Sequence, residues 1–342
     1  MPTISDVARA AGVSPSTVSY VLSGRRPISA QTRARVQAAI AELGFHPHAG
    51  ARALASSRTN VLALVVPLRV DVNVPVIMQF ATAVVTAARS YNHDVLLLTK
   101  DEGTAGLERV ANSTMVDALI VMDVERDDVR IPALRGLKQP SVLIGLPDDA
   151  AGIACVDLDF AAAAAVSLRH LAGHGHRRIA LVGPSPAVYQ RGTSYADRFL
   201  TGFTETAQAL GLSTVARACE PGLSGGENGV RAVLAQIDAE VPGVTALVVH
   251  NEEALLPLLE GLRSAGRQVP EDLSMVAVCP RDVAVGLPVR LTSVDIPAHD
   301  VGTLAVETAM DLLEGRSGAG TTLLAPTLVE RDSCAGILPS HR

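Results

Sequence analysis

Short runs of β-branched, apolar residues alternate with longer helical stretches across residues 60–342, and this alternation constrains the fold more than any other feature. Continuous apolar strands of this kind are typical of parallel sheets with helices on both faces. About ten strands over about 280 residues favour two sheets, hence two α/β lobes with a ligand cleft between them. The expected strands are 61–66, 94–98, 117–122, 141–145, 178–183, 244–249, 274–279 and 291–294. The expected helices are 76–90, 160–172, 195–210, 226–237, 252–265 and 298–313.

Length and composition favour a multidomain protein of the cytoplasm. A chain of 342 residues is longer than a domain with a single hydrophobic core usually is. It contains no apolar run of the roughly 18 residues that a membrane helix needs. Residues 1–6 lack the basic and apolar stretches of a secretory signal. We therefore expect a cytoplasmic location and no membrane partner.

Charge is distributed unevenly along the chain. Residues 1–60 hold seven arginines and two acidic residues, a net charge of +5, so the remainder carries −11 of the total of −6. A basic head on an acidic body is expected where only the head meets a polyanion such as DNA. A solvated basic face without a partner would show the same charge.

The basic segment has the pattern of three short helices. Thr3 can cap the first helix and Gly12 can end it in a left-handed conformation. Ser14 can cap the second, with Pro15 in its first turn, and residues 30–43 form the third. Two helices joined by a tight turn make a helix-turn-helix. The residues expected to face the small core are Ile4, Val7, Ala8, Ala11, Val13, Val18, Val21, Leu22, Val36, Ile40 and Leu43.

The second helix has an outward face of short polar groups and one phenol. Such side chains allow a helix to approach base edges, and its N-terminus favours phosphate. An ordinary capped helix in a small bundle is the alternative. The residues on this face are Ser14, Pro15, Ser16, Thr17, Ser19 and Tyr20.

Residues 3–19, TISDVARAAGVSPSTVS, resemble in order and spacing the head of the LacI/GalR (lactose/galactose repressor) family. The resemblance implies that Pro15, Ser16 and Tyr20 read the major groove. The family commonly has arginine at the position of Tyr20, and a tyrosine cannot grip guanine with two hydrogen bonds. The usual operator sequence is therefore in doubt. The DNA contacts expected overall are Thr3, Ser5, Ser14, Pro15, Ser16, Thr17, Ser19, Tyr20, Arg25, Arg26, Thr32, Arg33, Arg52 and Leu54.

Residues 46–58, HPHAGARALASSR, resemble the hinge helix of the same family. The resemblance implies that hinge helices from two subunits enter the minor groove, with Leu54 as a wedge between base pairs and Arg52 near phosphate. About two helical turns are marginal alone, which suits a switch. The alternative is a linker whose Leu54 contacts the body.

The body resembles the family's sensing domain, which has the fold of periplasmic sugar-binding proteins. The matching segments are 116–121, 173–183, 198–203, 269–274 and 328–333. The implied organisation is a head at 1–47, a hinge at 48–59 and a sensing domain at 60–342. The lobes are expected to exchange chain near residues 158, 292 and 321, which divides them into 60–158 with 292–320 and 159–291 with 321–338. The C-terminal end has no leucine heptads, so we expect a homodimer.

The effector pocket is predicted from the same resemblance. Arg198 matches the family's effector-binding arginine, whose guanidinium can hold two oxygens, and Asn251 with Glu252 stands where the family has an Asn-Asp pair. A surface ion pair is the alternative for Arg198, and a helix cap for Asn251. Cys279 occupies a position that is often a ligand-binding aspartate. The full set of expected contacts is Asp71, Asn73, Tyr189, Tyr195, Arg198, Asn251, Glu252 and Cys279.

The chain contains no tryptophan, and only 3% of its residues are aromatic. Sugar faces commonly stack on aromatic rings, so this composition favours a sugar effector less than the family resemblance does, and the effector is expected to be a sugar or another metabolite.

Catalytic and metal-binding patterns are not found in the sequence. The histidines His170, His174 and His176 lack a glutamate at HExxH spacing, and the four cysteines form no CxxC pair. There is no phosphate-binding loop with its lysine and no GxSxG nucleophile elbow. We therefore expect no enzyme, no metal site and no cofactor.

The function that these features predict is sequence-specific DNA binding by a dimeric transcription regulator under the control of a small-molecule effector. The family resemblance implies repression, because most relatives repress. Two alternatives are a small-molecule binding protein with a vestigial head and a regulator whose altered pocket takes no effector.

Overall fold

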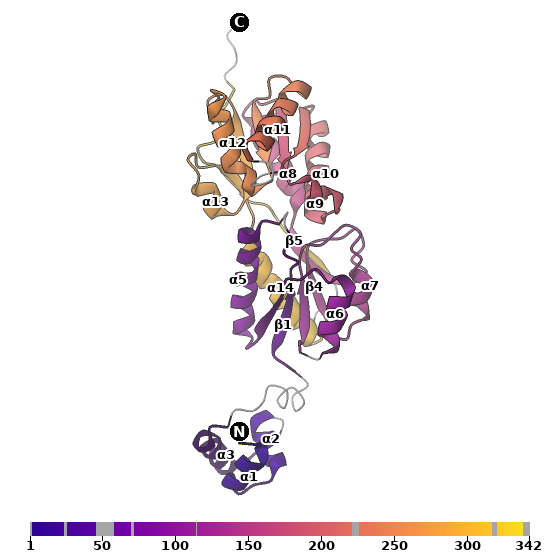
Figure 1. The fold of residues 1–342 in the computed structure, drawn as a ribbon, viewed down its shortest axis with the longest axis vertical. Helices are drawn as coiled ribbons and strands as arrows, with labels where there is room; N and C mark the ends of the chain where they lie inside the picture. Colours follow the sequence, from indigo (N-terminus) through magenta and orange to yellow (C-terminus); the bar gives the residue numbers. More distant parts are fainter. Residues whose placement is uncertain are drawn as a thin grey trace.

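The computed structural model describes residues 2–23, 26–45, 58–69, 72–113, 115–220, 226–316 and 320–337. Along the chain a small helical head is followed by two α/β lobes (Figure 1). This is the expected fold class. In the described part of the chain, no helix has the length and apolar character to cross a membrane.

The head contains α1 (Ile4–Ala11), α2 (Pro15–Ser23) and α3 (Ala30–Leu43). Thr3 caps α1 in a capping box with Asp6, and Gly12 ends the helix at φ 62°. Ser14 accepts a hydrogen bond from the backbone N–H of Thr17 at 3.2 Å, as expected of a cap. Six apolar residues of the helices and Phe45 form the core, namely Val7, Ala8, Ala11, Val18, Val36, Ala39 and Phe45.

The inward position predicted for Leu43 is wrong, because its side chain is 36% exposed. After Gly44, at φ 57°, the chain turns back and Phe45 N–H donates to the carbonyl of Ile40. Phe45 therefore closes this end of the core, where Leu43 was expected.

The first sheet has the strand order β11-β5-β4-β3-β1-β2, and all its pairs are parallel. Alternate residues of β1 point to opposite faces, so Leu62 and Leu64 join one cluster and Ala63 and Val65 the other. One face is covered by α5 (Val74–Ser90) and α14 (Ala298–Leu313), and the other by α6 (Gly103–Asn112) and α7 (Ile131–Gly136). The strands are β1 (Val61–Val65), β2 (Asp94–Leu98), β3 (Ala118–Val121), β4 (Ser141–Ile144), β5 (Ala154–Leu158) and β11 (Thr321–Leu324).

The second sheet has the order β12-β10-β9-β8-β6-β7, and only β12 is antiparallel to its neighbour. One face is covered by α8 (Phe160–Gly173) and α10 (Ser194–Ala209), and the other by α11 (Gly226–Glu240) and α12 (Glu252–Ser264). The strands are β6 (Arg178–Gly183), β7 (Ser213–Ala218), β8 (Ala246–Val249), β9 (Ser274–Cys279), β10 (Thr292–Asp295) and β12 (Leu328–Val329). Two short helices, α9 (Pro186–Gln190) and α13 (Arg281–Val285), follow β6 and β9.

The chain passes between the two lobes three times, and two of the expected exchange points need correction. The first lies between β5 and α8, close to the expected residue 158. The second follows β10, at residues 296–297 and not near 292, because β10 belongs to the second sheet. The third lies at residues 325–327 and not near 321, because β11 pairs with β5 in the first sheet.

Candidate functional site

The exposed N-terminal turn of α2 carries a small network of hydroxyl groups. The hydroxyl of Ser14 lies 2.8 Å from that of Ser16 and 2.9 Å from that of Thr17. Ser14 also caps the helix, so its oxygen is committed to the backbone, whereas Ser16 and Pro15 are exposed beside it. Short side chains at a helix N-terminus can approach a groove closely and can bind phosphate.

Tyr20 lies one turn further along α2 and is half-buried. The guanidinium of Arg26 lies over its ring, 5.3 Å from the centroid, a cation–π arrangement. The phenol and a cation therefore form one surface, which sequence spacing alone did not predict.

The other predicted DNA contacts differ in their surroundings. Thr3 and Ser5 are exposed at the start of α1, Ser19 is half-buried, and Arg33 is exposed on α3 beside the half-buried Thr32. The hydroxyl of Thr32 accepts a hydrogen bond from Ser29, the cap of α3. Three predicted contacts, Arg25, Arg52 and Leu54, lie outside the described residues.

A cavity of about 430 Å³ lies between the two lobes at the carboxyl ends of the strands. In the first lobe it is bounded by residues that follow β3 and β4, and in the second by residues that follow β6 and β8. Four of the predicted effector contacts line it, namely Asn73, Tyr195, Asn251 and Glu252. The cavity is where an open α/β sheet is expected to bind its ligand.

Arg198 does not line the cavity, because its guanidinium is bound to the protein. One amino group donates to the Asp157 carboxylate at 2.6 Å and the other donates to the carbonyl of Leu158 at 2.9 Å. Burial raises the pKa of Asp157 to about 6, against the opposing effect of Arg198. The ion pair, which was the alternative for Arg198, is formed within the protein and not at its surface.

Asn251 lines the cavity, but its amide is fully engaged. Its Nδ2 donates to the carbonyls of Gly183 and Cys219 at 3.1 and 3.0 Å, and its Oδ1 accepts from the backbone N–H of Ala254. The residue therefore caps α12 and joins it to the ends of β6 and β7. Asn73 similarly caps α5 while it faces the cavity.

Two other cavity residues carry polar groups with unusual properties. Burial raises the pKa of Glu252 to about 7 and lowers the pKa of His250 to about 3. The His250 ring lies among three aromatic rings, with centroid separations of 5.5 Å to Phe160, 5.4 Å to Tyr195 and 4.3 Å to Phe199. Its Nδ1 is buried and has no hydrogen-bond partner among the described residues. His250 is neutral at pH 7 and can donate or accept one hydrogen bond.

His250 was not predicted as a site residue, although its position directly after the buried strand β8 is a usable signal. Asp123, which follows β3 and lines the cavity, was not predicted either. Asp123 accepts from Arg69 at 2.6 Å and lies 3.5 Å from Arg191, in a network that includes Glu125.

The remaining predicted contacts are not part of the cavity wall. Cys279 is fully buried in the core between the second sheet and α12, so its prediction as an effector contact is wrong. Burial raises the pKa of its thiol, as expected of an inert, buried cysteine. Tyr189 is not among the lining residues, and its hydroxyl packs against Gly183. Asp71 lies outside the described residues.

Comparisons with known proteins cover both parts of the chain. Residues 3–48 match the family described as bacterial regulatory proteins, lacI family. Residues 168–334 match the periplasmic binding protein-like domain. The HTH-type transcriptional regulator GalR of Escherichia coli (strain K12) is 31% identical over 343 residues, which cover 97% of this chain and 96% of GalR. The HTH-type transcriptional regulator CelR of Thermobifida fusca is 29% identical over 345 residues, which cover 97% and 98% of the two chains.

Solved structures agree with these matches. A complex of the transcriptional regulator CelR with cellobiose has a TM-score of 0.69 and 26% identity, covering 97% of this chain and all, 100%, of that one. The lac repressor dimer bound to operator and the anti-inducer ONPF has a TM-score of 0.83 at 22% identity, covering 98% and 99% of the two chains, which shows the shared fold. Because a regulator 31% identical matches along nearly its whole length, the chain belongs to the lacI family of bacterial regulatory proteins and is a DNA-binding transcription regulator.

Proposed function

We propose that this regulator is a repressor that binds a palindromic operator as a homodimer and responds to a small effector in the cleft between its lobes. The observation that carries the proposal is the exposed hydroxyl face of α2, formed by Ser14, Ser16 and Thr17 beside Tyr20 and Arg26. Side chains of this size and polarity can reach base edges, while the arginines of the head neutralise phosphates.

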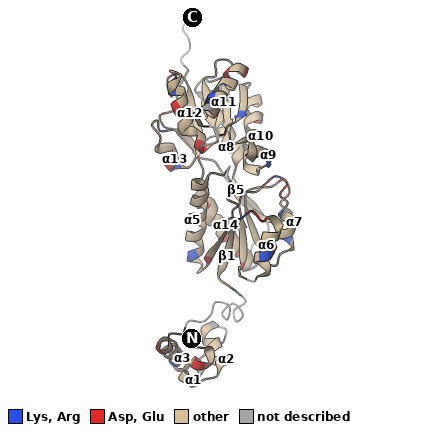
Figure 2. Cartoon of the chain, in the orientation of Figure 1, with Lys and Arg blue, Asp and Glu red and all other residues tan. Residues whose placement is uncertain are grey.

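An exposed apolar stripe on α5 supports the homodimer. Val74, Met78 and Val85 are 40%, 41% and 42% exposed and recur at helical spacing on one face. A groove that includes Met78 of this face continues across the second lobe to Val285 of α13, which is 45% exposed. Figure 2 shows that α5 is free of charged residues along most of its length. Charge depletion and exposed apolar area are typical of an interface.

The charge of the cleft favours an uncharged or cationic effector. Among the charged residues of the described part of the chain that line the cleft, five are acidic and Arg191 alone is basic; the acidic residues are Asp123, Asp157, Glu220, Glu252 and Glu253. Arg198 would be the natural anion receptor, but Asp157 already neutralises it. A phosphate ester or a dicarboxylate would meet net negative charge, whereas a polyol, a nucleoside or an amine would not.

Aromatic and apolar side chains complete the binding surface. Phe80, Phe160 and Tyr195 line the cavity together with valine and isoleucine side chains. These rings offer the stacking surface that the absence of tryptophan had put in question. The cellobiose complex of CelR gives a first candidate class, hydroxylated carbohydrates, to be tested beside nucleosides and amines.

A change of the angle between the lobes is the proposed way in which effector binding in the cleft alters operator binding by the heads. Gln79 of α5 donates to the Asp282 carboxylate of α13 at 3.2 Å, and Arg126 of the first lobe lies 3.7 Å from Asp197 of the second. An effector that favours one lobe angle would shift these contacts, and the dimer would transmit the change to the heads.

The operator proposal is tested by selection of binding sites from a random duplex library with full-length protein. We expect a palindromic site whose affinity exceeds that of random competitor by about 10³-fold or more at physiological salt. No preference for any duplex would contradict the proposal.

The contribution of Tyr20 is isolated by Tyr20→Phe, which keeps the ring under Arg26 and removes only the hydroxyl. We expect the selected sequence to change at one position per half-site and non-specific affinity to stay the same, with a specific loss of about 1–3 kcal/mol. Tyr91→Phe, which alters an exposed tyrosine of the first lobe, is the matched control. An equal loss on specific and random DNA would show that Tyr20 reads no base.

A regulator that acts without an effector is the second candidate, because Arg198 and Asn251 both spend their hydrogen bonds inside the protein. A thermal-shift screen of sugars, nucleosides, amines and organic acids distinguishes the two. Stabilisation by a neutral or cationic compound that is lost in the double variant E252Q/H250F supports effector binding in the cleft. Absence of any hit supports the second candidate.

A further inference from the structure

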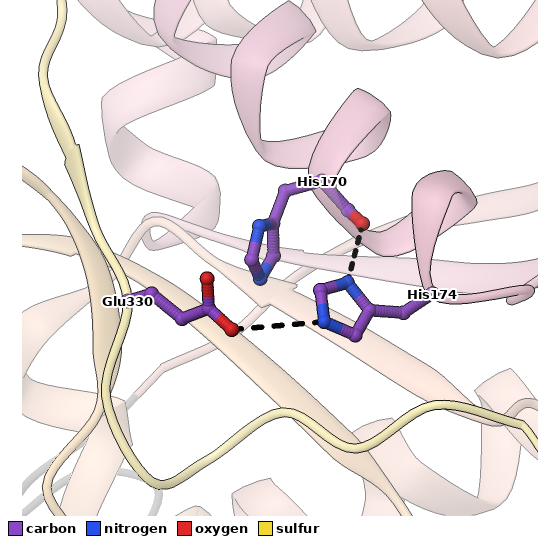
Figure 3. A group of neighbouring side chains, drawn as sticks. All are labelled: His170, His174 and Glu330. Atoms are coloured by element: carbon purple, nitrogen blue, oxygen red, sulfur yellow. Dashed lines mark hydrogen bonds and ion pairs between the residues drawn. The ribbon is translucent and has the colours of Figure 1, made fainter.

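The C-terminal end of α8 brings two histidines next to a glutamate from the far end of the chain. His170 and His174 stand one helical turn apart, and Glu330 follows β12 (Figure 3). One ligand atom from each of the three side chains lies within 4.8 Å of the others. His174 Nε2 and a Glu330 carboxylate oxygen are 3.7 Å apart.

We propose that His170, His174 and Glu330 form a binding site for a divalent transition metal ion, with Zn²⁺ as the best match. Two imidazoles and one carboxylate are a ligand set that Zn²⁺ prefers, and they leave a fourth position for water. Ligands about 2.1 Å from a tetrahedral ion stand about 3.4 Å apart. The 3.7 Å pair is close to that value, and the exposed Glu330 side chain can adjust.

The hydrogen bonds already select the correct tautomer of His174. Its Nδ1 lies 2.9 Å from the carbonyl oxygen of His170, and a carbonyl can only accept, so Nδ1 carries the proton. Nε2 then has a free lone pair directed at Glu330 (Figure 3). A backbone acceptor for the second ring nitrogen is the arrangement that metal-binding histidines usually have.

His170 presents the second donor. Its Nε2 is buried and has no hydrogen-bond partner among the described residues, which leaves a polar atom unsatisfied until something binds it. Its ring is 4.5 Å from that of His174, centroid to centroid. Burial, and to a smaller degree His174, lowers the pKa of His170, so the ring is neutral and able to bind a metal at pH 7.

The nearby His176 is a structural histidine and differs from His170 and His174. Its Nδ1 bonds the Thr245 hydroxyl at 2.9 Å, and its Nε2 lies 3.0 Å from the Ser274 hydroxyl. Both nitrogens are satisfied, so His176 is excluded as a ligand. It holds the C-terminal segment 330–337 against the second lobe, as does the bond from Ile337 N–H to the carbonyl of His174.

A metal ion at this site would affect the connection between the two lobes. Glu330 follows the third passage between the lobes, residues 325–327, by three residues. A bound ion would tie this passage to α8 in addition to the hydrogen bonds of β12. Because only the folded chain brings the three ligands together, the ion should also stabilise the folded protein.

Titration of Zn²⁺ into untagged, metal-free, full-length protein by calorimetry tests the site. We expect one high-affinity ion per chain, and loss of affinity of at least about tenfold in Glu330→Gln and His174→Ala, because even loss of an outer hydrogen bond costs about 10–100-fold. Glu330 is exposed, so its variant should fold normally. His299→Ala is the matched control, since His299 lies 3.2 Å from Asp300 without a second histidine.

A thermal readout separates this site from other histidines. Zn²⁺ at about 100-fold above its Kd should raise the Tm of the wild type and of H299A by several degrees, and should leave that of E330Q nearly unchanged. The proposal is overturned if no ion binds at micromolar concentration, or if E330Q and H174A bind Zn²⁺ as tightly as the wild type.

Discussion

At the scale of single residues, the cleft contains polar groups of two kinds. Asn251 and Arg198 satisfy their hydrogen bonds within the protein and thereby fix the ends of the strands and the start of α12. The Nδ1 of His250 has no hydrogen-bond partner among the described residues, and burial opposes the charged forms of both His250 and Glu252. A ligand that hydrogen-bonds to His250 or Glu252 gains the most binding free energy, because burial of these polar groups is otherwise costly.

Glu252→Gln should make the protein less sensitive to pH. The folded pKa of Glu252 is raised to about 7 from an ordinary 4.5, so between these values the folded state holds a proton that the unfolded state has lost. Stability of the wild type therefore falls as pH rises from about 5 to about 7. The full linkage, about 3 kcal/mol, is an upper bound because the side chain lines an open cleft.

We expect the variant to gain about 1–2 kcal/mol over the wild type at pH 8 and little at pH 5. Urea unfolding at four pH values from 5 to 8 measures the difference. Glu260→Gln, a change at an exposed position further along α12, is the control and should leave the pH profile unchanged. A constant difference between Glu252→Gln and wild type at all pH values would show that Glu252 is ionised throughout.

Local chemistry was predictable at this scale, whereas partners distant in sequence were not. Thr3, Ser14 and Gly12 cap their helices as the pattern indicates, because a cap involves residues three or four apart. Asp157 stands 41 residues before Arg198, and Glu330 stands 156 residues after His174. No periodicity connects such pairs, so the ion pair and the cluster were found only in the folded chain.

At the scale of helices and strands, the packing of α10 against α8 explains a glycine at position 202. Gly202 lies in α10 where it crosses α8, and a Cβ added there would be 2.4 Å from the carbonyl oxygen of Ala161. The obstacle is backbone of a neighbouring helix, which cannot move aside cheaply. The glycine of the segment 198–203 is therefore needed for close helix contact.

Gly202→Ala should destabilise the protein by about 1–3 kcal/mol through this overlap, although alanine favours a helix. Gly136→Ala is the matched control, because Gly136 ends α7 with nothing within 4 Å of an added Cβ. The control should be neutral or slightly stabilising in urea unfolding. Equal behaviour of the two variants would mean that α8 and α10 separate without cost.

Continuous apolar runs were predictable as strands, and shorter or more polar runs were not. The bounds expected for β2, β6 and β9 agree with the structure, since each is a continuous run beside clear helices. Four strands were not predicted, namely β5, β7, β11 and β12. Of these, β7 and β11 lie at sheet edges with exposed residues, and β12 has only two residues.

At the scale of the whole molecule, the two-lobed α/β architecture was predictable from the sequence. The order of the strands in each sheet became known only from the folded structure. The lobes exchange chain through β10 and β11, whose sheet membership depends on pairing with strands far away in sequence. Such pairing is set by global packing and leaves little local signal. Two of the three predicted passages were about four residues away from their observed positions, which is the usual error of boundaries predicted from sequence.

The face of α5 provides the last prediction, that Met78→Glu with Val85→Glu converts the dimer into monomers. Two carboxylates in the centre of an apolar interface would be desolvated without partners, a cost large enough to prevent association. Sedimentation velocity measures the species. Both residues are more than 40% exposed, so the monomer itself should fold with an unchanged circular dichroism spectrum.

Operator binding should change in a way that separates dimer loss from damage to the head. Two linked heads gain about 10²–10⁴ in affinity on a palindrome through effective concentration, so the double variant should lose that factor there and keep its affinity for a single half-site. Val129→Glu adds a glutamate at a large apolar residue that is 69% exposed and lies outside the α5 face, and it should remain dimeric. If the α5 variant stays dimeric with full palindrome affinity, this face is not the interface and a different surface must join the heads.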